Sequence, residues 1–344
     1  MDFNFPKIEL HLHLDGAVPV ETWWSIAERE GVKMPTATIE EFRDWLVKTS
    51  VCDSVPEYLE RFDLPLQIMQ SKENITEITE SLIDRLEQLG YGYAEIRFAP
   101  QFHCRNGLTQ KDAVEAVLQA RENALKRHAR PGIGILLCCM SIGPETVNMD
   151  ENFETVRLAK EYQGKGVVGL DLAGAEGIVP LTNFSPLFDL ARELGVPYTL
   201  HAENDHDAVS VREVMDMGAW RIGHGHRLYN APELWERAKK NRIALEICPS
   251  SNIQCKTQPS YKEHPAKKLF DEGIMVTINT DNSTLAAVTL EDEYRHCIED
   301  MGFENNDLVR MNIYAAEAAF MPENEKKKLI EELEQYLITE EEKK

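Results

Sequence analysis

Several features of other protein classes are missing from this 344-residue sequence. No apolar run approaches the roughly 20 residues that a membrane-spanning helix needs. The first residues have neither the basic start nor the apolar centre of a signal peptide. The seven cysteines form no Cys-x-x-Cys pair, and an odd number of cysteines is typical of reduced thiols. Together these absences predict a cytoplasmic protein.

Positive charge is also scarce. Lys and Arg number 37 against 59 Asp and Glu, so the formal net charge is -22. An acidic field of this strength repels phosphate groups, and we therefore expect neither a nucleic acid nor a membrane surface as a partner. Hydrophobic residues make up 43% of the chain, which is enough for one large globular domain. The sequence predicts no particular oligomeric state.

What the sequence does contain is a regular alternation of short apolar, β-branched runs with amphipathic segments. Strands that alternate with helices eight times in a chain of this length predict an α/β protein, a (β/α)8 TIM barrel. A doubly wound open sheet is the competing interpretation, but no Gly-x-Gly-x-x-Gly follows the first run. The expected strands cover residues 8–14, 93–99, 133–140, 167–172, 197–202, 221–224, 243–248 and 274–279.

One connection is much longer than the others. Residues 15–92 separate the first two expected strands and contain four helical patterns, at 20–31, 38–48, 56–69 and 74–89. Because the loop after a barrel strand lies on the active-site face, we interpret 15–92 as a helical lid over the pocket. A peripheral decoration is the alternative. Residues 1–344 as a whole are expected to form a single domain.

Polar side chains occur where the expected strands end. His11 and His13 are separated by one residue, so both point to the same side of the first strand. His201, His224 and Asp281 end or follow the fifth, sixth and eighth strands. These ends meet at one face of a barrel, and three imidazoles with one carboxylate are ligands that suit zinc. The alternative is a set of unrelated polar residues near strand ends.

Glu203 lies two residues beyond His201 and is the candidate proton donor. A carboxylic acid in a dry cleft has a raised pKa and stays protonated at neutral pH. His224 would then deprotonate or orient a water molecule whose pKa the metal lowers. The alternative for Glu203 is a surface carboxylate in an acidic loop.

With these residues assembled, the chain resembles the adenosine deaminase family of metal-dependent barrel hydrolases over nearly its whole length. Five segments in the family's order carry the resemblance, and together they are more specific than any one alone. They are ELHLHLDGA (9–17), DLAGAEG (171–177), RIGHGHR (221–227), LEICPSSN (245–252) and INTDN (278–282). The family fold is a (β/α)8 barrel with zinc at the strand ends.

The resemblance implies zinc-dependent hydrolytic deamination of adenosine or 2'-deoxyadenosine, with a small-molecule purine nucleoside as the partner. It implies that Glu203 protonates purine N1, while His224 and Asp281 position the attacking water. The implied ligands of one zinc ion per chain are His11, His13, His201 and Asp281. The implied substrate contacts are Asp15 with the ribose 5'-hydroxyl, Gly174 with purine N3, and Val55, Tyr58 and Phe62 as an apolar lid. That last stripe could equally pack the lid helix itself.

Two positions depart from the family's pattern. The usual His-Ala-Gly-Glu reads here as His201-Ala202-Glu203-Asn204, and we take Glu203 as the acid. The alternative places Asn204 there, which would remove the proton donor. The usual pair of acids after the last strand reads Asp281-Asn282, and its second position contacts purine N7.

These departures leave alternatives open. The enzyme could deaminate another 6-aminopurine, either adenine or a 5'-modified adenosine. It could also be a catalytically silent barrel that binds a nucleoside. Other histidines are assigned no chemistry: His103 and His264 are expected at surface or loop positions, and His226 is expected to be a neighbour of the site.

Overall fold

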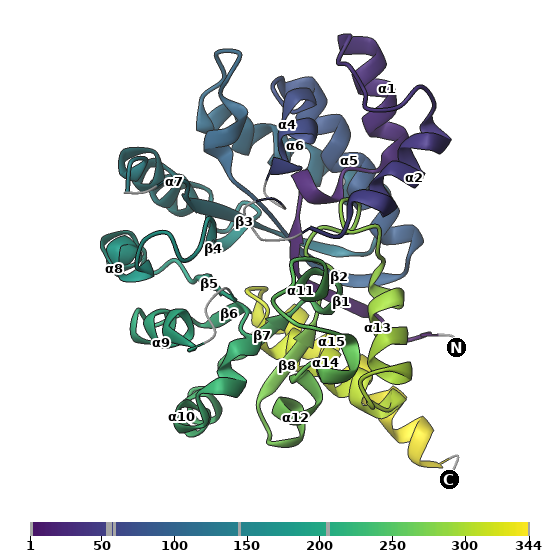
Figure 1. The fold of residues 1–344 in the computed structure, drawn as a ribbon, viewed down its shortest axis with the longest axis vertical. Coiled ribbons are helices and arrows are strands. Elements are labelled where there is room, and N and C mark those ends of the chain that lie inside the picture. Colours follow the sequence, from purple (N-terminus) through teal and green to yellow (C-terminus); the bar gives the residue numbers. More distant parts are fainter. Residues whose placement is uncertain (1–2, 53–56, 58–59, 144–145, 204–206, 343–344) are drawn as a thin grey trace.

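The computed structural model of the chain describes residues 3–52, 57, 60–143, 146–203 and 207–342. Figure 1 shows strands at the centre of the molecule and helices around them. The strands are β1 (Lys7–His13), β2 (Tyr91–Phe98), β3 (Gly132–Ser141), β4 (Val167–Gly174), β5 (Thr199–Ala202), β6 (Arg221–His224), β7 (Ala244–Ile247) and β8 (Met275–Ile278). Each lies where the sequence predicts a strand.

The strands pair in parallel and in chain order. Strands β1 to β4 form one sheet and β5 to β8 form another. Isolated bridges join the two sheets at both edges, between Leu170 and Tyr198 and between Leu12 and Asp281. This arrangement confirms the predicted α/β barrel.

Helices follow the strands, and most of them cover the outer side of the strands (Figure 1). They are α6 (Gln110–Arg127), α7 (Met149–Tyr162), α8 (Ser185–Leu194), α9 (Val209–Asp216), α10 (Trp235–Lys240), α11 (Pro249–Gln254), α12 (Ala266–Asp271), α13 (Leu290–Glu299), α14 (Asn305–Ala318) and α15 (Glu323–Glu342). Local signals set their ends. The Thr109 side chain caps α6 by accepting a hydrogen bond from the backbone of Asp112, and Gly195 ends α8 with a left-handed φ of 69°. Among the described residues, none of the helices combines the length and apolar character that crossing a bilayer requires.

The insertion between β1 and β2 is helical where it is described. It contains α1 (Val20–Glu30), α2 (Ile39–Thr49), α4 (Asp63–Ile68) and α5 (Lys72–Gln88). The predicted helix at 56–69 is described as α4 only from Asp63 onward, and Val55 and Tyr58 lie outside the described residues. The interpretation of 15–92 as a lid, and of 1–344 as one domain, stays a prediction.

Side chains alternate between two environments along the strands. On β1, Ile8 and Leu10 belong to the apolar core of the molecule. Their neighbours Glu9 and His11 make polar contacts instead, Glu9 with the backbone N–H of Thr280 and His11 with a carboxylate. This period of two is the one that a half-polar strand requires. It directs the chemistry-bearing residues toward the barrel interior.

Candidate active site

A cavity of about 350 Å³ lies at the carboxyl ends of the strands. This volume is in the range of small-molecule sites. The cavity lining includes most of the predicted site residues, namely His13, Asp15, Phe62, Gly174, His201, Glu203, His224, Asp281 and Asn282. His11 lies behind this lining and is fully buried.

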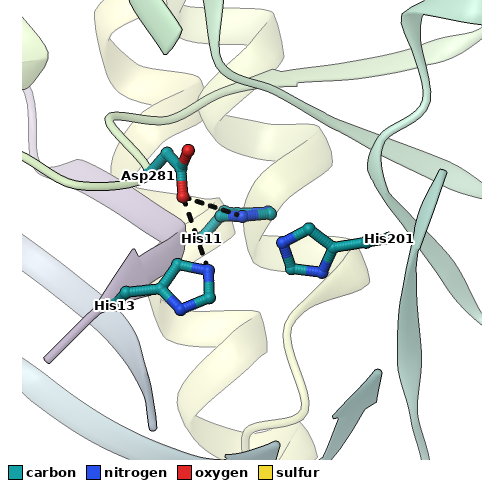
Figure 2. A group of neighbouring side chains, drawn as sticks. All are labelled: His11, His13, His201 and Asp281. Carbon is teal, nitrogen blue, oxygen red and sulfur yellow. Dashed lines mark ion pairs between the residues drawn. The ribbon is translucent and has the colours of Figure 1, made fainter. Parts of the chain in front are cut away.

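Four side chains from three parts of the barrel converge beside this cavity (Figure 2). His11 and His13 come from β1, His201 from β5, and Asp281 from the turn after β8. One ligand atom from each lies within 4.8 Å of the others. A Cβ atom on Gly223 of β6 would lie 3.2 Å from ring atoms of both His11 and His201, so the glycine leaves room for this cluster.

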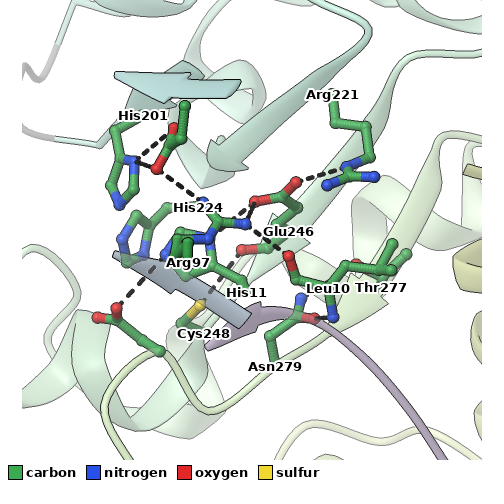
Figure 3. A network of polar contacts seen from close by, with 12 residues as sticks. Leu10, His11, Arg97, His201, Arg221, His224, Glu246, Cys248, Thr277 and Asn279 are labelled. Atoms are coloured by element: carbon green, nitrogen blue, oxygen red, sulfur yellow. Dashed lines mark hydrogen bonds and ion pairs between the residues drawn. The ribbon is translucent and has the colours of Figure 1, made fainter. Parts of the chain in front are cut away.

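Buried carboxylates orient two of these imidazoles (Figure 3). Glu246 Oε2 lies 2.8 Å from His11 Nδ1, and Asp171 Oδ1 lies 3.1 Å from His201 Nδ1. An ionised carboxylate can only accept, so each Nδ1 carries a hydrogen, and when the ring is neutral its Nε2 offers a lone pair to the site. Arg97 bridges the two carboxylates, at 2.8 Å from Glu246 and 3.0 Å from Asp171.

The Nε2 atom of His11 tests whether these residues fit a metal ion. It is buried, makes no hydrogen bond, and lies 3.4 Å from Asp281 Oδ1, which is also 3.4 Å from His13 Nε2. A lone pair that faces a carboxylate oxygen at this distance is repelled unless a proton or a cation lies between them. The other oxygen of Asp281 accepts a hydrogen bond from Ser251. The residues therefore fit a divalent cation with nitrogen and oxygen ligands.

Glu203 and His224 lie next to each other in the lining of the same cavity. Glu203 Oε2 lies 3.5 Å from His224 Nδ1. Burial, with the nearby charges of Glu176 and Asp281, raises the pKa of the Glu203 carboxyl to about 8. Burial also lowers the pKa of His224 well below its ordinary value, and the nearby His11 adds to this. Both shifts favour the neutral forms of the two groups, a protonated acid beside a neutral imidazole.

The backbone is unusual at two of these positions. His224 has a φ of 55° and Asp281 a φ of 61°, both in the left-handed region that is uncommon for residues other than glycine. Arg221 and Gly223 face the barrel interior, so strand alternation alone would point His224 outward. The left-handed backbone instead lets His224 line the cavity. Such strain concentrates at functional sites.

The predicted substrate contacts lie around the same cavity. Burial raises the pKa of the Asp15 carboxyl to about 7. Gly174 has a φ of 106°, and a Cβ atom there would lie 2.5 Å from the carbonyl oxygen of Ser141, so only glycine fits. Asn282 is 2% exposed, and its Oδ1 has no hydrogen-bond partner among the described residues.

Several residues around the site were missed by sequence reasoning. Arg97, Asp171, Glu246 and Asn252 all contact predicted site residues or their partners. Three of them stand in or beside the segments that carry the family resemblance, which was the available signal. Their partners come from other strands and could not be assigned from spacing.

The expectation of surface or loop positions is wrong on exposure for two histidines, although His264 does lie in a loop. His103 and His264 are buried rather than at the surface. His103 Nδ1 lies 2.9 Å from the carbonyl oxygen of Met69, and His264 Nε2 lies 3.1 Å from Asn252 Oδ1. Each is covered by a segment that the sequence alone did not place against it.

A larger hollow of about 1360 Å³ lies at the opposite ends of the strands. Its lining includes Arg192, Trp220 and Phe320. Both clusters of metal-ligating side chains found among the described residues contain His11 and so lie at the carboxyl ends instead. The chemistry is therefore concentrated in the smaller cavity.

Comparison with known proteins identifies the family. The model of the family described as adenosine deaminase matches residues 6–336. The chain belongs to the adenosine deaminase family. The adenosine deaminase of Haemophilus ducreyi is 36% identical over 335 residues, which cover 96% of each chain. Membership of this metal-dependent family makes the protein a hydrolase, as the resemblance implied.

Solved structures agree with the fold. The adenine deaminase of Arthrobacter aurescens superposes with a TM-score of 0.85 at 23% identity, covering 96% of this chain and 99% of that one. An amidohydrolase from Burkholderia ambifaria, solved with bound zinc, superposes with a TM-score of 0.82 at 21% identity, covering 98% and 93%. The adenosine deaminase family fold is thus shared with enzymes of distant sequence.

Proposed function

We propose that this protein catalyses the hydrolytic deamination of adenosine and 2'-deoxyadenosine to the corresponding inosine product and ammonia. The observation that carries the proposal is the placement of Glu203, an acid whose pKa is raised by burial, in the same cavity as His13, His201 and Asp281. The name of the Haemophilus ducreyi relative supports the choice of substrate. A small-molecule purine nucleoside is therefore the proposed partner. We also propose that the protein acts in the cytoplasm.

The proposed cofactor is one zinc ion per chain, held by His11, His13, His201 and Asp281. The unpartnered Nε2 of His11 and the nitrogen and oxygen donors support this choice of ion. Zinc bound there would lower the pKa of a coordinated water to about 7. Glu246 and Asp171 hold two of the ligand rings in the orientation that binding requires.

The residues divide the remaining chemistry among them. Glu203 donates its proton to purine N1, which makes C6 electrophilic. His224 and Asp281 would orient a water molecule that has released a proton to solvent, and its oxygen would add to C6. The hydrogen left on that oxygen passes to N6, the C6–N6 bond breaks, and ammonia leaves. Glu203 regains from solvent the proton that the water released.

Substrate recognition would use the rest of the cavity. Asp15 would bind the ribose 5'-hydroxyl, the backbone at Gly174 would contact purine N3, and Asn282 would donate to N7. Val55, Tyr58 and Phe62 would cover the nucleoside as part of the lid at residues 15–92. Phe62 supports this role, since its ring centroid lies 6.4 Å from that of His13.

A panel of 6-aminopurines tests the proposal, with absorbance and ammonia release as readouts. We expect turnover of adenosine and 2'-deoxyadenosine and about one equivalent of zinc by elemental analysis. Faster turnover of adenine or of a 5'-modified adenosine would identify that compound as the substrate instead. Silence on every purine by the zinc-loaded protein would favour a nucleoside-binding barrel.

A pair of variants tests the acid. Glu203→Gln keeps the shape of the side chain but removes the transferable proton, so kcat should fall by about 10²–10⁴-fold. Asn204→Ala is the matched control and should be much milder. The reverse order of effects would assign the position of the family's acid to Asn204.

A further inference from the structure

One amide group reaches both Glu203 and His224. Asn252 lies on α11, is fully buried, and is not used by the mechanism above. Its Nδ2 lies 3.1 Å from Glu203 Oε2 and 3.0 Å from His224 Nδ1. An amide nitrogen carries two hydrogens, so it can donate one to each acceptor.

The contact with His264 identifies which atom of the Asn252 amide is the oxygen and which is the nitrogen. The backbone N–H of Ala266 donates to His264 Nδ1 at 3.2 Å, so the neutral ring carries its hydrogen on Nε2. His264 Nε2 lies 3.1 Å from Asn252 Oδ1 and donates to it. Burial lowers the pKa of His264 to about 3, which keeps this ring neutral. The hydrogen bonds thus run in one direction, from the backbone to the two catalytic side chains.

We propose that Asn252, held by His264, is a positioning residue that places the proton of Glu203 on Oε1 and the hydrogen of His224 on Nε2. The proposal rests on the proposed roles of Glu203 and His224. The amide hydrogen occupies Oε2 of the acid, which leaves Oε1 to carry the proton that is transferred. The other amide hydrogen occupies His224 Nδ1, which makes this imidazole a hydrogen-bond donor through Nε2.

The isosteric variant Asn252→Asp tests this directly. A carboxylate still accepts from His264 but offers no hydrogen to His224, so the hydrogen of the His224 ring should move to Nδ1. Nitrogen-15 NMR of the zinc-loaded, histidine-labelled protein reads this change, with the His224 signal assigned by its loss in His224→Ala. We expect kcat to fall by about 10²-fold while KM changes little, because the acid and the imidazole lose their alignment.

Three further variants and a control keep the test decisive. Asn252→Ala removes the donor without adding a buried charge. It should also lower kcat, and it should leave the His224 ring as a mixture of its Nδ1–H and Nε2–H tautomers. His264→Ala should lower kcat by about 10–100-fold, and His264→Gln, whose amide can donate to Asn252, should restore part of the loss. Asn312→Asp is the matched control: this buried asparagine accepts from the backbone of Ile8, outside the site, and should leave kcat and the His224 signal unchanged.

The proposal is overturned if His224 of the wild type carries its hydrogen on Nδ1, or if Asn252→Asp leaves the tautomer unchanged. It is also overturned if the loss of kcat merely follows the loss of bound zinc or of folded protein. Failure of the proposed function is a separate result. A wild type that deaminates no purine would refute the activity, while the NMR readout would still report on the hydrogen bonds of Asn252.

Discussion

The barrel interior and the layer between strands and helices are built from opposite kinds of residue. On β6, Ile222 belongs to the apolar core, whereas its neighbour Arg221 is fully buried among carboxylates. Leu200 and His201 on β5 divide in the same way. Apolar burial is non-directional, so it can hold the fold together without fixing the angle of any side chain. Hydrogen-bonded charges are directional, and here they orient the rings of His11 and His201.

The interior charges form one connected set (Figure 3). Arg221 donates to Glu246 at 2.6 Å and to Glu95 at 2.5 Å, and Arg97 joins Glu246 to Asp171. Each guanidinium therefore lies between two carboxylates. Removal of one partner from such a buried pair leaves an uncompensated charge. We infer that the interior charges contribute more to the orientation of the proposed metal ligands than to net stability.

The largest expected effect is that of Arg97→Met, which removes the cation shared by Glu246 and Asp171. The free energy of unfolding should fall by about 3–5 kcal/mol, because two buried carboxylates lose the cation that lies between them. The affinity for zinc should also fall, by about 10–100-fold, because both ligand rings lose their orientation. Denaturant unfolding of the metal-free protein and competition with a chelator measure the two effects separately. Unchanged zinc affinity in a folded variant would contradict the role assigned to the interior.

The outer layer should respond in only one of these two measurements. Leu200→Ala removes a fully buried side chain next to the ligand His201 but on the opposite side of β5. The free energy of unfolding should fall by about 2–5 kcal/mol, because a cavity replaces apolar contacts. The kcat of the folded variant and its zinc content should match the wild type. A large fall in kcat would show that the two sides of the strand are not separable.

Much of this architecture could be predicted from the sequence, and the reason is the same contrast. In runs such as residues 8–14, every second side chain faces outward and is apolar, and this regular period allows the strand to be predicted. The convergence of the proposed metal ligands could be predicted because they stand at strand ends, where a barrel brings them together. Arg97 and His264 could not be assigned roles, because each depends on a partner from a distant segment whose register the sequence does not state.

A buried acid with no cationic partner among the described residues sharpens the comparison further. Glu293 accepts hydrogen bonds from the backbone of Ser250 at the start of α11, and burial raises its pKa to about 8. The folded state therefore holds this proton more tightly than the unfolded state, whose carboxyl has a pKa of about 4.5. The contribution of this proton to the free energy of unfolding is fully present below pH 4.5. It is lost as the pH rises toward 8, by up to about 1.4 kcal/mol per pH unit.

The variant Glu293→Gln should remove this slope. Its amide oxygen can still accept from Ser250, but it takes up no charge as the pH rises. Denaturant unfolding of both proteins from pH 5 to about pH 8 measures the difference. Parallel pH dependences would show that Glu293 ionises in the folded state as it does in the unfolded one.

The smallest expected effect concerns Asn282, where the two environments meet. Its side chain packs so closely that a Cβ atom on Gly16 would lie 1.9 Å from Oδ1, so this amide has little freedom to turn. Purine N7 can only accept a hydrogen bond, and an amide donates one without first taking up a proton, whereas an aspartate must be protonated to do so. One neutral hydrogen bond contributes about 0.5–1.5 kcal/mol, so kcat/KM for 7-deazaadenosine should be up to about tenfold below that for adenosine. Asn282→Asp should lower kcat/KM for adenosine and narrow this difference. Equal rates of the wild type on both substrates would mean that Asn282 does not contact N7, and the departure from the family's second acid would then point to a different substrate.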